Sequence, residues 1–222
     1  MEENILLNFL GSDAGFGEKN NSAYLEVNNE LYLIDCGFTV FQDLIKKFDF
    51  EKYNKVNVII THLHNDHAGS LSQFILFMWF VYGKKVTVIS TCENIKIYLE
   101  ITGTPEISYD LKKGLDNLEF IRTEHVKELD SYGFKWNIGG KKIVYTGDTY
   151  TLKPFMESLK NADELYTDIS KNGGVHLKYD EAYEQLKNIK QNGTKVVLMH
   201  IDDKKYIEEK VRDEFIVTKL EI

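Results

Sequence analysis

This chain is poor in the residues that build disulfide scaffolds and rigid loops. Its 222 residues include two cysteines and two prolines, and it has no low-complexity tract. The two cysteines, Cys36 and Cys92, do not form a CxxC pair, so a disulfide framework is excluded. We expect both to be buried thiols in a reducing compartment.

The sequence also has no apolar run long enough to cross a bilayer. The longest run, residues 74–82 (FILFMWFVY), falls well short of the roughly 20 residues that a membrane-spanning helix needs. The first residues, MEEN, do not form the basic region of a secretory signal. We therefore expect a cytoplasmic protein with no membrane partner.

Positive charge is scarce relative to negative charge. The formal net charge of −8 argues against a long nucleic-acid partner, because nonspecific binding of phosphate backbones needs a basic surface. Hydrophobic residues make up 43% of the chain, which is enough for a substantial core. The length predicts one domain spanning residues 1–222.

Short β-rich segments alternate with helical ones along the chain. Asn28-Asn29 and Gly139-Gly140 are typical of two tight hairpins, because these residues tolerate positive φ. The predicted strands cover residues 5–10, 23–27, 31–36, 56–60, 85–90, 118–122, 132–138, 142–147, 164–169, 195–200 and 214–220. The predicted helices cover residues 39–48, 67–82, 92–101, 152–161, 178–191 and 203–212. This mixture favours an α/β (α+β) fold with two sheets covered by helices.

Half of the six histidines lie in one short stretch, VIITHLHNDHAGS, at residues 58–70. His62 and His64 are two apart at the end of a predicted strand, so their side chains point to the same side. Asp66 and His67 follow where the chain turns toward the next helix. Imidazole and carboxylate groups are the preferred ligands of Zn, Mn and Fe, and this arrangement suits two metal ions better than one.

The other histidines lie in segments that could converge on this turn. His125 follows a predicted strand, His200 ends another, and His176 lies in a loop that leads into a helix. Asp148 in VYTGDTY lies where a carboxylate can project from a sheet edge. A lone histidine at a strand end is usually structural, but the motif at residues 62–67 makes His125, Asp148 and His200 candidate ligands.

The order of these motifs resembles the metallo-β-lactamase superfamily. LIDCG (33–37), THLHNDHAG (61–69), the lone His125, YTGDT (145–149) and a final His200 carry the resemblance over nearly the whole chain. It implies a four-layer αββα sandwich of two mixed β-sheets flanked by helices. It also implies two sets of metal ligands and a bridging residue: His62, His64 and His125 for one metal, Asp66, His67 and His200 for the other, and Asp148 between them. Asp35 resembles the family's buried carboxylate behind the ligands, and an ordinary strand-end cap is its alternative.

In motif style the chain is most similar to the ribonuclease Z and phosphodiesterase branch. That resemblance implies catalytic roles for Asp168 and His176, although TDIS replaces the usual run and Lys178 replaces a small hydroxyl residue. Only 23 residues lead from His125 to Asp148, so the tRNA-clamping arm of ribonuclease Z is missing. Full tRNA processing is not expected. The glycine-rich loop GSDAGFG (11–17) lacks the features of a P-loop, and we interpret it as a wall of the cleft or as an ordinary surface loop.

These features together predict a metal-dependent hydrolase of phosphodiester or related phosphate-ester bonds. A metal-bridging hydroxide would attack, with Asp66 orienting it and His176 near the leaving group. Zinc is the first expectation for the two ions, with manganese or iron as alternatives. The expected partner is a small-molecule or short oligonucleotide anionic substrate, and a dimer is compatible with the sequence. Hydrolysis of a thioester, lactone or β-lactam remains open, as does a non-catalytic metal-dependent binding or sensor protein on the same fold.

Overall fold

Two six-stranded sheets form the centre of the molecule. The computed structural model describes residues 5–212 and 214–220. The first sheet contains β1 (Asn8–Gly11), β2 (Ser22–Val27), β3 (Glu30–Ile34), β4 (Lys55–Ile59), β5 (Val86–Ile89) and β6 (Tyr109–Lys112), in that order. The second contains β7 (Leu118–Arg122), β8 (Tyr132–Ile138), β9 (Lys141–Tyr145), β10 (Glu164–Ile169), β11 (Lys195–Ile201) and β12 (Ile216–Val217), in the order β12-β11-β10-β9-β8-β7.

Both sheets are mixed, as the sequence predicts. In each sheet two antiparallel pairings come first in the chain and three parallel pairings follow. The Asn28-Asn29 hairpin joins β2 to β3, with φ values of 52° and 59°, and Gly139-Gly140 joins β8 to β9. Both predicted hairpins are confirmed.

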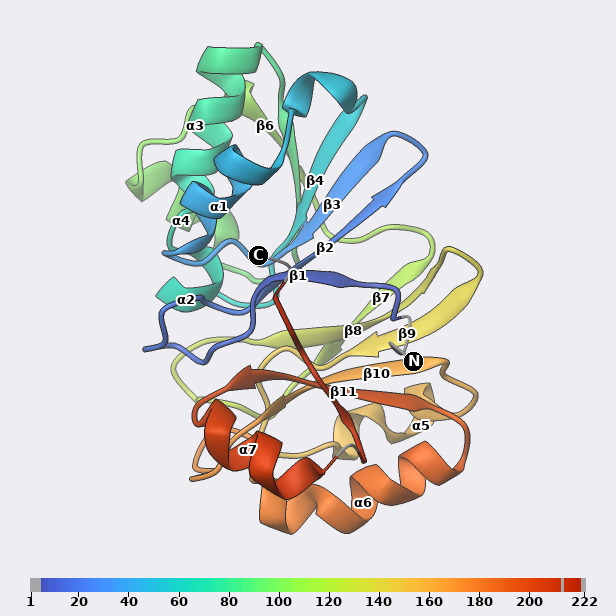
Figure 1. Cartoon of the computed structure of the whole chain (residues 1–222). Helices are drawn as coiled ribbons and strands as arrows, with labels where there is room; N and C mark the ends of the chain where they lie inside the picture. The colour runs from blue at the N-terminus through green and yellow to red at the C-terminus, as the bar shows by residue number, and fades with distance from the viewer. Residues whose placement is uncertain (1–4, 213, 221–222) are drawn as a thin grey trace.

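Helices cover the outer face of each sheet, so the fold is the predicted αββα sandwich (Figure 1). The helices of the first half are α1 (Val40–Lys47), α2 (Asn65–Ala68), α3 (Leu71–Tyr82) and α4 (Ile95–Ile101), with the short 3-10 helices η1 (Phe50–Lys52) and η2 (Glu106–Ser108). Those of the second half are η3 (Lys153–Phe155), α5 (Met156–Leu159), α6 (Tyr179–Gln191) and α7 (Lys204–Val211).

Three apolar clusters fill the interfaces between the four layers. Strand β4 shows how the alternation of side chains divides them: Val56 and Val58 pack against the outer helices, whereas Ile59 faces the second sheet. In β11, Leu198 faces the helices of its own half and Met199 faces the first sheet. Strands that are buried on both faces in this way fix the two sheets against each other.

Several predicted boundaries are wrong. The helix expected at 67–82 is two helices, because the chain breaks at Gly69 and Ser70 between α2 and α3. The helix expected at 152–161 becomes η3 followed by the short α5. The last predicted strand, 214–220, narrows to two residues, and β6 was not predicted at all. In the described part of the chain no helix is both long and apolar enough to span a membrane.

Candidate metal centre

All six histidines of the chain meet where the two sheets bring their strand ends together. The THLHNDH turn follows β4, and His125 follows β7 after two intervening residues. Asp148 comes soon after β9, whereas His200 lies near the end of β11. The carboxyl ends of parallel strands share one edge of a sheet, so segments far apart in the sequence can place ligands around one point.

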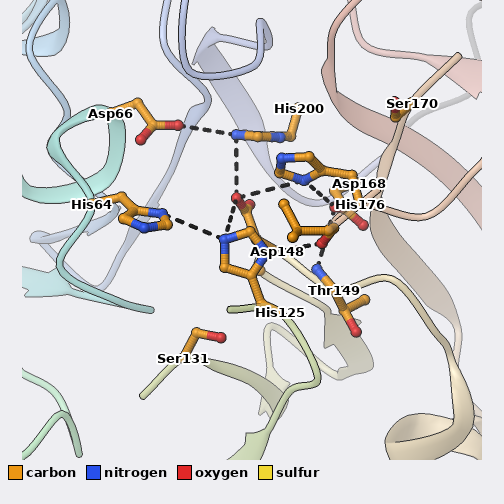
Figure 2. A network of polar contacts seen from close by, with 12 residues as sticks. His64, Asp66, His125, Ser131, Asp148, Thr149, Asp168, Ser170, His176 and His200 are labelled. Carbon is orange, nitrogen blue, oxygen red and sulfur yellow. Dashed lines mark hydrogen bonds and ion pairs between the residues drawn. The ribbon is translucent and has the colours of Figure 1, made fainter. Parts of the chain in front are cut away.

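The first set of candidate ligands contains His62, His64, His125 and Asp148, whose ligand atoms all lie within 4.8 Å of one another. His64 Nδ1 lies 3.0 Å from His62 Nε2 and 3.4 Å from His125 Nε2. Asp148 Oδ2 is 3.8 Å from His62 Nε2 and 3.7 Å from His125 Nε2. Figure 2 shows His64, His125 and Asp148 facing a common point.

The second set contains Asp66, His67, His200 and the same Asp148. His200 Nε2 lies 3.3 Å from His67 Nε2 and 3.2 Å from Asp66 Oδ2. Asp148 approaches both rings, with Oδ1 3.4 Å from His67 Nε2 and Oδ2 3.5 Å from His200 Nε2. The Asp148 carboxylate therefore belongs to both sets.

Hydrogen bonds behind the ligands orient their rings toward this point. His67 donates from Nδ1 to Asp35 Oδ2 at 2.8 Å, so its Nε2 faces the second set. Thr61 Oγ1 also donates to Asp35 at 2.8 Å and lies 3.1 Å from His62 Nδ1. Asp35 thus fixes His67 directly and His62 through Thr61. A carboxylate that holds a histidine in this way is the usual support of a metal ligand.

His125 is oriented by a backbone carbonyl of the 170–176 loop. Its Nδ1 donates to the carbonyl oxygen of Val175 at 2.8 Å, which leaves Nε2 facing the first set. His176, which follows Val175 in the chain, donates from Nδ1 to Asp168 Oδ2 at 3.0 Å. Asp168 is fully buried, while the His176 side chain remains 24% exposed. Of this pair, His176 is therefore the residue that can reach a substrate.

Burial and neighbouring charge shift the pKa values of these groups in different directions. Burial lowers the pKa values of His62, His64 and His125. Burial also opposes the charged form of Asp148, but His200 and His67 outweigh it and hold the carboxyl pKa well below its usual range. In the first set, neutral imidazoles beside an ionised carboxylate are the protonation states that bind a metal.

Asp168 and His176, which are hydrogen-bonded to each other, both have raised pKa values. Burial raises the pKa of Asp168 to about 6. Burial alone would lower the pKa of His176, but Asp168 and Asp148 raise it to about 9. His176 is therefore a charged imidazolium near neutral pH when the site holds only its own side chains.

The residues fit a pair of divalent cations. In the first set, lone pairs of neutral imidazoles that point at one another 3.0 and 3.4 Å apart repel unless a cation or a proton lies between them. Asp148 Oδ1 is buried with no hydrogen-bond partner among the described residues. Such an orphaned carboxylate oxygen is expected of a metal ligand. A third cluster contains Asp148, Asp168, His176 and His200, but it shares two members with the second set.

Asp35, behind the ligands, and His200, a candidate ligand, hold backbone conformations that residues other than glycine rarely adopt. Asp35 has φ of 61° and His200 has φ of 51°. His200 lies at a bulge in β11, because Met199 pairs with Asp168 while Ile201 pairs with Ile169. The bulge lets the His200 side chain turn to the site, and its backbone N–H donates to Asn21 Oδ1 at 3.3 Å. Strain of this kind is typical of functional sites.

The structure brings together all the ligands that the sequence predicted, and it places Asp35 behind them as the resemblance implies. The other supports were missed. Thr61, Asn21 and the Val175 carbonyl were not predicted. Thr61 begins the THLHNDH run, so its position beside two ligands was a usable signal. The Val175 carbonyl gives no signal, because any residue offers the same backbone oxygen.

Known proteins match most of the length of this chain. A family model described as Anti-Pycsar protein Apyc1 matches residues 5–97 and 90–219. The chain is 27% identical to the Anti-Pycsar protein Apyc1 of Bacillus phage 010DV004, over 91% of each chain. It is 25% identical to ribonuclease Z of Archaeoglobus fulgidus, over 88% of this chain and 86% of that protein.

A solved structure shows the same fold. The metallo-β-lactamase fold protein YhfI from Bacillus subtilis superposes with a TM-score of 0.76 at 18% identity, covering 95% of this chain and 94% of that one. The resemblance inferred from the motifs is therefore confirmed. This chain has the metallo-β-lactamase fold and belongs to the Anti-Pycsar protein Apyc1 family.

Proposed function

We propose that this chain is a two-metal phosphodiesterase acting on a small anionic substrate, and that a cyclic mononucleotide is the substrate class to test first. One observation carries the proposal: two sets of four ligand atoms share the Asp148 carboxylate. Paired cations at such a site are typical of enzymes that displace an oxygen from phosphorus. The family name denotes opposition to Pycsar, and degradation of a cyclic nucleotide is the activity that it suggests.

The ligand assignment is part of this proposal. His62, His64 and His125 would hold one ion, and Asp66, His67 and His200 the other, with Asp148 between them. Two divalent cations bound there would polarise a phosphoryl oxygen of the substrate and make a water easier to deprotonate near neutral pH. Zinc is the first candidate, because nitrogen and oxygen donors of this kind suit it, and manganese and iron accept the same donors.

The protein's own groups would then orient the reactants. Asp66, whose side chain is 15% exposed while those of His67 and His200 are buried, would orient the attacking water. His176 would donate a proton to the leaving oxygen, and Asp168 would hold its ring through the 3.0 Å bond to Nδ1. Asp168 would therefore position His176 and not contact the substrate.

Charge and size favour a small substrate. Two divalent cations beside the carboxylates of Asp66 and Asp148 leave the site net positive, which attracts a phosphate although the chain carries −8 overall. The short interval between His125 and Asp148 holds only a loop and the strands β8 and β9, so it has no arm that could clamp a tRNA.

The proposed compartment is the cytoplasm, since Cys36 and Cys92 are both free thiols.

A substrate panel tests this proposal. Purified protein loaded with Zn, Mn or Fe is assayed on cyclic mononucleotides, bis(p-nitrophenyl) phosphate, a lactone and a thioester. We expect turnover of the phosphodiesters that is lost on chelation and restored by added metal. Turnover of only the carbonyl substrates would contradict the proposal. So would the absence of any turnover from protein that holds two metals per chain, an outcome that favours a binding or sensor role.

A further inference from the structure

Two exposed phenylalanines lie beside the second ligand set. Phe16 is fully exposed and Phe38 is 64% exposed, although an apolar ring of this size is normally buried. The proposed chemistry uses neither residue. Each belongs to a loop that approaches the helix α2, which carries Asp66 and His67.

Phe16 lies in a tight turn that rests against Asp66. The backbone N–H of Gly17 donates to the carbonyl of Ala14 at 2.8 Å, so Gly15 and Phe16 are the central residues of the turn. A Cβ at Gly15 would lie 3.1 Å from Asp66 Oδ2, so glycine lets the turn approach the carboxylate this closely. The Ala14 N–H also donates to the carbonyl of Ile201, next to His200, at 3.0 Å.

Phe38 lies in a second loop that contacts the same short helix. Its backbone N–H donates to the carbonyl of Asn65 at 3.2 Å. Its ring lies against Gly69, where an added Cβ would be 3.1 Å from Phe38 Cγ. The preceding Gly37 packs on the Asp66 backbone so closely that a Cβ there would collide with the Asp66 carbonyl oxygen.

A buried asparagine joins the two loops. Asn20 donates from Nδ2 to the carbonyl of Gly15 at 3.4 Å and accepts from the backbone N–H of Thr39 at 3.1 Å. Its own N–H donates to Thr39 Oγ1 at 2.8 Å. Because Asn20 is only 3% exposed, this connection is part of the packed structure. It holds the residue before Phe16 and the residue after Phe38 in a fixed relation beside the site.

We propose that Phe16 and Phe38 form an aromatic subsite that stacks on the base of a nucleotide substrate while its phosphate lies at the metal centre. The inference rests on the proposed phosphodiesterase function and narrows its substrate to phosphodiesters that carry an aromatic base. Stacking on an aromatic ring tolerates any base, since every base offers a π face. The subsite therefore accepts pyrimidine and purine bases alike.

The test compares cyclic AMP and cyclic CMP with the same cyclic ribose phosphate lacking a base, with ring opening followed by ³¹P NMR. The variants are Phe16→Ala, Phe38→Ala and the double variant. Phe80→Ala is the control, because Phe80 is 74% exposed on the outer helix α3. For the double variant we expect KM for both cyclic nucleotides to rise about tenfold or more, with kcat nearly unchanged. KM for the base-free substrate stays at the wild-type value.

A wild-type KM in the Phe16→Tyr variant, which keeps the aromatic ring, supports stacking. Equal KM values of the wild type for the cyclic nucleotides and the base-free substrate would overturn the subsite, as would equal KM increases on both in the double variant. A changed elution volume on size exclusion with unchanged KM values would assign the two rings to self-association and also overturn it. Failure of the wild type to open any of the three substrates would instead contradict the phosphodiesterase itself.

Discussion

At the scale of single residues, His176 belongs to neither of the two ligand sets and is hydrogen-bonded to Asp168. Its Nδ1 donates to Asp168, so replacing it removes a proton donor and leaves both ligand sets in place. We expect His176→Gln to lower kcat by about 100-fold while the metal content stays unchanged. The loss will be much smaller on bis(p-nitrophenyl) phosphate, whose leaving group needs no proton, than on a cyclic nucleotide. Steady-state kinetics on both substrates decides this, and equal losses would exclude a proton-donor role.

Asp35 affects both ligand sets from behind. It accepts from Thr61 N at 2.8 Å and from His67 Nδ1, and it adopts a left-handed φ that asparagine also tolerates. Asp35→Asn should therefore fold but bind metal about 10- to 100-fold more weakly, as expected when the carboxylate behind a ligand is lost. Metal titration measures this. Asp110→Asn, on the exposed edge strand β6, is the matched control, and wild-type affinity in Asp35→Asn would remove Asp35 from the site.

The burial of the two cysteines can be tested independently of metal binding. Burial raises the pKa of both Cys36 and Cys92 to about 12. Because the thiolate is the reactive form, both should resist a disulfide reagent such as DTNB at pH 8 and react fully after unfolding in guanidinium. Rapid labelling of the native protein would show that at least one thiol is accessible.

At the scale of secondary-structure elements, the Asn28-Asn29 hairpin is set by local conformation. Both residues have positive φ, which asparagine and glycine adopt with little strain and β-branched residues do not. We expect Asn29→Val to destabilise the protein by about 1–2 kcal/mol and Asn29→Gly to be nearly neutral. Urea unfolding of both variants measures the difference. Equal stabilities would mean that the turn does not require this conformation.

Elements were predictable where their signal was local. The asparagine and glycine hairpins and the apolar strands such as β10 and β11 have clear signals, and each was expected at nearly its observed bounds. Strand β6 was missed because YDLK has no apolar run and three of its four residues are exposed at the sheet edge. The continuous apolar pattern from Leu71 to Tyr82 concealed the break before it, where the backbone N–H of Ser70 donates to the Cys36 carbonyl at 3.0 Å and not back along the helix.

At the scale of the whole molecule, the site exists only because two sheets meet. The THLHNDH turn comes from the first sheet, whereas His125, Asp148 and His200 come from the second. The sequence alone predicted that the turn binds metal, because its ligands lie within six residues. That motif also made His125, Asp148 and His200 candidate ligands. Their division into two metal sets came from the family resemblance, since no local pattern encodes a contact between residues 133 positions apart such as that of His67 with His200.

The central claim is that Asp148 joins two cation sites in one centre, and metal stoichiometry tests it most directly. After chelation, reconstitution with zinc and removal of excess metal, elemental analysis should find two ions per chain in the wild type. Asp148→Asn should retain fewer than two, and His176→Gln should retain both. A wild-type protein that binds no ion tightly, or an Asp148→Asn variant that still holds two, would contradict the account.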